Sequence, residues 1–81
     1  MSGVRFKAEV RERDAAGRWT EGARHRSEDI AVLVDRYPSP AWDVAKGRIA
    51  ALAGGDHTRI QLDEYTAIIL ERAAASVLAD G

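Results

Sequence analysis

The sequence predicts a small α+β fold: an antiparallel β-hairpin, with a third short strand, that carries about three α-helices on one face. Three observations predict it. Apolar and charged residues alternate near the N-terminus, helix-spaced apolar residues with start and stop signals follow, and an apolar segment comes last. The expected element order is β-β-α-α-(β)-α, and we expect residues 1–81 to form one domain.

The first expected element is a hairpin. Its first strand alternates apolar with charged residues, the apolar ones being Val4, Phe6, Ala8 and Val10. Residues 14–17 predict a four-residue loop, because Asp14 favours the first turn position and Gly17 supplies a positive φ. In the return strand we expect Trp19 to cover the core across from Val10, and Gly22 to end the pairing.

Two helices are expected in the middle of the chain. The first has Ser27 as its N-cap, is stopped by Pro38, and has an apolar stripe of Ile30, Leu33, Val34 and Tyr37. The second begins at Ser39-Pro40, ends at Gly54-Gly55, and buries Trp42, Ala45, Ile49, Leu52 and Ala53.

The last third of the chain is expected to hold a short strand and a helix. Weak alternation over residues 57–62 predicts the strand, and an irregular loop is the competing interpretation. Asp63 is expected to cap a final helix that runs to about Ala79. This helix has more apolar residues than one buried face needs, because Tyr65, Ile68 and Ile69 lie away from its main stripe and beside Arg72.

Composition excludes several classes of protein. The absence of Cys removes disulfides, cysteine-based zinc sites and thiol catalysis. The N-terminal residues do not resemble a signal peptide, and no apolar stretch approaches the roughly 20 residues that a bilayer requires. We therefore expect a cytoplasmic protein with no membrane partner.

The candidate chemistry is sparse. His25 and His57 are not in metal-ligand spacing, and a loop beside a helix start explains Asp56-His57 and Asp63-Glu64 as well as a metal site does. The candidate nucleophiles, Ser27, Ser39 and Thr58, lie at the starts of expected elements, where capping accounts for them. We expect no catalytic residues, no metal and no cofactor, and hence no enzyme.

Charge is divided unevenly along the chain. Residues 1–26 have seven basic and four acidic side chains, whereas residues 27–81 have five basic and nine acidic ones, so the two parts stand at +3 and −4. Such a division can mark a surface for a charged partner, or the two parts can simply neutralise each other.

One side of the first hairpin is basic: Arg5, Lys7, Arg11, Arg13 and, across the turn, Arg18. Alternate strand residues are about 6.6 Å apart, close to the phosphate spacing of a nucleic acid strand. The competing interpretation is an edge hairpin that uses charge to discourage aggregation. We favour it, because Glu9 and Glu12 interrupt the row and no exposed aromatic side chain accompanies it: Trp19 and Trp42 are both expected in the core.

The leading hypothesis from the sequence is a non-catalytic module that binds a protein partner or itself as a homo-oligomer, through Tyr65, Ile68, Ile69 and Arg72. The alternative is a nucleic-acid-binding protein that uses the basic hairpin. A third hypothesis is an inhibitor or antitoxin-like protein whose acidic C-terminal half covers a basic target. The short length and the excess of Arg and Ala would suit an accessory protein of a bacterium or its phage.

Overall fold

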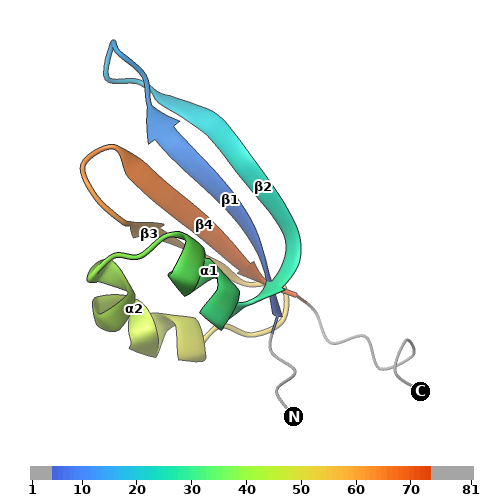
Figure 1. Cartoon of the computed structure of the whole chain (residues 1–81). Coiled ribbons are helices and arrows are strands. Elements are labelled where there is room, and N and C mark those ends of the chain that lie inside the picture. The colour runs from blue at the N-terminus through green and yellow to red at the C-terminus, as the bar shows by residue number, and fades with distance from the viewer. Residues whose placement is uncertain (1–4, 74–81) are drawn as a thin grey trace.

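The protein consists of two layers, a four-stranded antiparallel sheet and two helices on one of its faces (Figure 1). The computed structural model describes residues 5–73. The strands are β1 (Arg5–Arg13), β2 (Trp19–Asp29), β3 (His57–Gln61) and β4 (Thr66–Arg72), and the helices are α1 (Ile30–Arg36) and α2 (Ala41–Ala50). The sheet order is β2-β1-β4-β3, so β1 and β4 are central and β2 and β3 form the edges. The predicted α+β class is confirmed.

The first hairpin forms where it is predicted, with a different loop. Phe6, Ala8 and Val10 of β1 are buried. The backbone N–H of Asp14 donates to the carbonyl of Arg18 (2.8 Å), so the loop has three residues and not four. Gly17 has a φ of 82°, and the Asp14 carboxylate accepts from the backbone N–H of Ala16, which stabilises the turn.

Strand β2 does not end at Gly22 but continues to Asp29. Its register with β1 is irregular at two places, one of them beside Gly22. A Cβ atom at Gly22 would lie 2.6 Å from the carbonyl oxygen of Val10. Gly22 therefore permits two backbones to approach closely, and this is a different role from ending the strand.

Helix α1 begins directly at the end of β2. Its N-cap is Asp29, whose carboxylate accepts from the backbone N–H of Ala31 (3.0 Å), so the prediction of Ser27 as the cap is wrong. Because β2 extends further than expected, Ser27 lies within the strand. Tyr37, just past α1, connects its end to β2, since its hydroxyl hydrogen-bonds His25 Nε2 (2.8 Å) and His25 Nδ1 contacts Glu28.

Helix α2 starts at Ala41, one residue after the predicted start, with Pro40 and not Ser39 as its N-cap residue. The Ser39 hydroxyl accepts from the backbone N–H of Ala41 (3.1 Å) and donates to the carbonyl of Leu62 (2.6 Å), which ties the helix start to the end of β3. Trp42 and Ala45 are buried as expected, although the helix stops at Ala50. The third strand is also confirmed, as β3.

The predicted final helix is wrong where the structure describes it, because residues 66–72 form strand β4; residues 74–79 lie outside the described residues. The Asp63 carboxylate accepts from the backbone N–H groups of Tyr65 (2.7 Å) and Thr66 (2.8 Å). An aspartate that caps a helix accepts from the same two positions, so the local signal is shared by a turn and a helix start. Here the turn connects β3 to β4.

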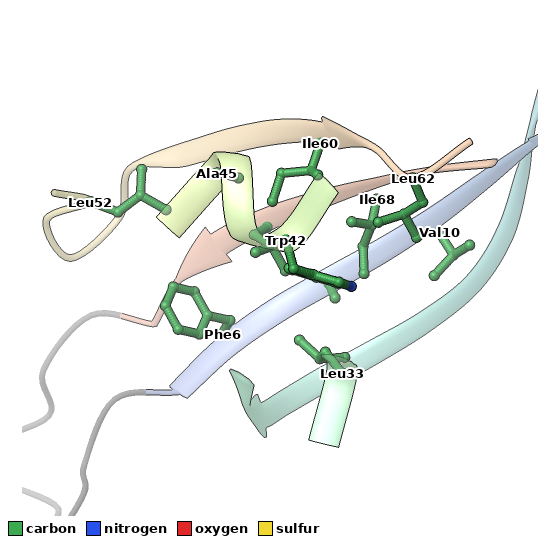
Figure 2. Close-up of a cluster of buried hydrophobic side chains, with 11 residues drawn as sticks. Phe6, Val10, Leu33, Trp42, Ala45, Leu52, Ile60, Leu62 and Ile68 are labelled. Carbon is green, nitrogen blue, oxygen red and sulfur yellow. The ribbon is translucent and has the colours of Figure 1, made fainter. Parts of the chain in front are cut away.

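The core lies between the helices and the sheet (Figure 2). Phe6, Ile60, Ile68 and Leu70 reach it from the strands, and Leu33 reaches it from α1. No polar or charged side chain is buried within residues 5–73. In the same range, no helix has the length and apolar character needed to cross a membrane.

The first prediction separates a buried strand from an exposed helix face at Ile68. Ile68→Ala should lower the free energy of unfolding by about 2–5 kcal/mol, because it opens a cavity at a fully buried position. Val44→Ala, at a position that is 86% exposed, is the control and should change it by no more than about 0.5 kcal/mol. Urea denaturation measures both, and equal effects would contradict the described core.

A second prediction compares two glycines. Gly47→Ala should stabilise the protein by about 1 kcal/mol, because Gly47 lies in α2 with open space around its Cα. Gly22→Ala should destabilise it by about 1–3 kcal/mol, because the new methyl group would clash with the backbone of β1. Urea denaturation again gives both values, and stabilisation by both substitutions would show that the close approach at Gly22 is absent.

Candidate functional site

One face of the sheet has no helix over it within residues 5–73, and we call it the open face (Figure 1). Side chains of a strand alternate between the two faces, so the strand register identifies those on the open face. They are Arg5, Lys7, Glu9, Arg11 and Arg13 of β1, Trp19, Glu21, Arg24, Arg26 and Asp29 of β2, Ala67, Ile69 and Glu71 of β4, and His57, Arg59 and Gln61 of β3.

The open face is strongly basic. Among the described residues, seven basic and four acidic side chains give this face a formal charge of +3, whereas the whole chain carries −1. Two of the basic groups are paired, Arg11 with Glu9 (3.1 Å) and Arg24 with Glu21 (2.8 Å). Among residues 5–73, Lys7, Arg13, Arg26 and Arg59 make no ion pair. Excess positive charge therefore remains for a partner.

The basic row lies on a central strand. β1 pairs with β2 on one side and with β4 on the other. The first hairpin does form one edge of the sheet, as the edge-protection interpretation expects. Of its two strands, however, the one with an unpaired edge within residues 5–73 is β2, and the basic row lies on β1, which is paired on both sides. Four of the five predicted basic residues share this strand; the fifth, Arg18, lies at the hairpin tip and pairs with Asp14 (3.5 Å).

Trp19 belongs to this face and not to the core. It is half-buried and pairs with Arg13 in the register, whereas Trp42 is 5% exposed in the core as predicted. The guanidinium carbon of Arg13 lies 4.4 Å from the centre of the Trp19 ring, and that of Arg59 lies 4.8 Å from it. An aromatic side chain thus accompanies the basic row, contrary to the prediction.

The loop length explains why the sequence prediction placed Trp19 wrongly. A four-residue loop over residues 14–17 would set Trp19 opposite Glu12, on the buried side of the hairpin. With the observed three-residue loop Trp19 lies opposite Arg13, and a shift of one residue moves a side chain to the other face. The sequence did contain a signal for the shorter loop. A glycine such as Gly17, directly before the return strand, is also typical of the last position of a three-residue loop.

The predicted protein-interface residues do not form one surface. Ile68 is buried in the core, so the expectation that it lies on an exposed face is wrong. Tyr65 is 64% exposed in the turn between β3 and β4, and Ile69 is half-buried on the open face. Arg72 donates to the carbonyl of Leu52 (2.6 Å). These residues are separated because the segment is a strand and not a helix.

A second concave region lies between the helices and the start of β1. This hollow of about 560 Å³ is lined mainly by apolar side chains. Its polar groups are engaged within the protein, Asp43 with Lys46 (3.4 Å) and Arg72 with the chain at Leu52. It offers less chemistry for recognition than the open face does.

The candidate metal residues are far apart along β3. Asp56 and His57 precede or begin this strand, and Asp63 and Glu64 follow it. Within residues 5–73, no three potential ligands of these types gather into a group.

Comparison of the chain with protein-family models, with curated proteins and with solved structures gave no match, so the open face itself is the starting point for a function.

Proposed function

We propose that this protein binds nucleic acid through the phosphates, with its open face as the binding surface. The observation that supports the proposal is the concentration of positive charge: +3 on the sheet face that no helix of residues 5–73 covers, in a chain whose net charge is −1. Phosphate contacts supply most of the sequence-independent affinity of nucleic-acid-binding proteins.

The positions of the basic groups also support it. Lys7, Arg24 and Arg26 line one shallow hollow near the middle of β1 and β2, and Arg13 and Arg59 lie at the far end beside Trp19. The basic groups therefore follow one direction along the sheet. Contacts with successive phosphates of one nucleic acid strand require such an arrangement.

The hypothesis of self-association has less support than it had from the sequence. It relied on a helical apolar face that includes Ile68, and β4 replaces that helix. The exposed large apolar residues within residues 5–73 are Val32 in α1, Val44 in α2 and Tyr65 in the turn between β3 and β4. They are few and come from separate parts of the chain, unlike the contiguous patches that mark protein interfaces.

The first test of this function is fluorescence anisotropy with labelled DNA and RNA at about 20 mM and about 150 mM salt. We expect binding that weakens with salt. Lys7→Gln with Arg26→Gln should weaken binding at least about tenfold at the lower salt and reduce the salt slope by about two. Lys46→Gln with Arg48→Gln removes the same charge from α2 and is the matched control. Equal losses in both variants would contradict a defined basic face, and no binding at low salt would reject the proposed function.

The second test increases affinity. Glu9→Gln should release Arg11 from its ion pair and tighten binding roughly two- to five-fold at low salt. Glu12→Gln is the control. It removes the same charge from β1, but Glu12 lies on the side of the strand opposite to the open face. Anisotropy measures both variants, and an effect of Glu12→Gln as large as that of Glu9→Gln would show that only net charge matters.

A further inference from the structure

We propose that the ligand of the open face is a single-stranded nucleic acid, and that one of its bases stacks on Trp19 after Arg59 leaves the ring. This inference rests on the proposed function and names the class of nucleic acid.

Trp19 lies at the end of the basic row and outside the core. It starts β2 next to the tip of the first hairpin (Figure 1). A large half-buried aromatic side chain at the end of a basic row combines the two parts of a single-strand binding surface, a cationic track and a stacking platform.

The two guanidinium groups at the ring are held differently. Arg13 also donates to the carbonyls of Glu64 (3.0 Å) and Gly17 (3.0 Å), so it is fixed in place. Arg59 makes no hydrogen bond or ion pair within residues 5–73. Its one polar interaction there is the cation–π contact with the Trp19 ring. Arg59 is therefore the group that can exchange.

Binding of a nucleic acid strand favours the movement of Arg59 from the Trp19 ring to a phosphate. A guanidinium over a partly exposed ring is held weakly, whereas a phosphate offers it a charge-assisted bidentate contact. When Arg59 turns to a phosphate, the ring surface that it covered becomes free for a base. The anchored Arg13 keeps the ring in its orientation.

The same geometry disfavours a duplex. Paired bases are stacked on each other and cannot reach an aromatic ring on a sheet, whereas unpaired bases can. Reading a duplex groove requires a projecting helix or a two-stranded ribbon. The basic row lies instead on β1, which is flanked by strands on both sides.

The experiment uses the two tryptophans of the chain as each other's control. In Trp42→Phe the only tryptophan is Trp19 on the open face, and in Trp19→Phe the only one is buried Trp42. Each is titrated with a single strand of about ten nucleotides, with its duplex, and with polyphosphate, which has the charge but no bases. Tryptophan emission and anisotropy of a labelled strand are recorded together.

We expect the single strand to quench the emission of Trp42→Phe, over the concentration range in which anisotropy rises. The emission of Trp19→Phe should not change. Polyphosphate should bind without comparable quenching, and Trp19→Ala should weaken single-strand binding about tenfold, with Trp19→Tyr recovering most of it. If Trp42→Phe does not fold, the difference between the native protein and Trp19→Phe gives the same signal.

The outcomes separate this inference from the proposed function. Salt-dependent binding of the single strand without quenching, or with unchanged affinity in Trp19→Ala, would overturn the stacking role and leave the basic face intact. Equal quenching by polyphosphate would show movement of Arg59 alone and would also overturn it. No binding of any nucleic acid at low salt would reject both.

Discussion

The pairing of β1 with β4 is the constraint on which the rest of the structure depends. It joins residues 6–12 to residues 66–72 in an antiparallel register without interruption. On one side of this pair Ala8 meets Leu70 and Val10 meets Ile68, and the two helices cover these residues. On the other side the same register aligns Lys7, Glu9 and Arg11 with Glu71, Ile69 and Ala67. The core and the open face are thus the two sides of one pair of strands.

Period-2 alternation in β1 was sufficient to predict which of its side chains are buried, because each alternate residue of a strand must face the same layer. The stripe of α2 and the Ser39-Pro40 start were predictable for the same kind of local reason. Residues 66–72 were not. Residues 67–70 are apolar on both sides of β4, with Ile68 and Leu70 in the core and Ala67 and Ile69 on the open face, so no alternation is visible. Asp63 signals a turn and a helix start equally well. Only the long-range pairing with β1 resolves the choice.

The functional surface was predictable only in part. Four basic residues of the first strand were identified together, since alternation alone places them on one side. Arg24, Arg26, Arg59 and Trp19 were not added to them. Their positions follow from the irregular register of β2, the location of β3 at the far edge, and a loop one residue shorter than expected. None of these is a local property of the sequence, and together they convert a basic stripe into a broad surface with an aromatic side chain.

The two ends of the described chain lie side by side, and this affects how the protein folds. The backbone N–H of Ala73 donates to the carbonyl of Arg5 (3.0 Å), so the first and last residues described are directly hydrogen-bonded. During synthesis β1 must wait for β4 to emerge before its second partner exists. Until then only the hairpin of β1 and β2 and the short helices can form, and β1 lacks β4 beside it. A fold whose central pairing closes such a long loop is expected to fold slowly for its size, because β1 and β4 can pair only after the whole segment between them has been synthesised.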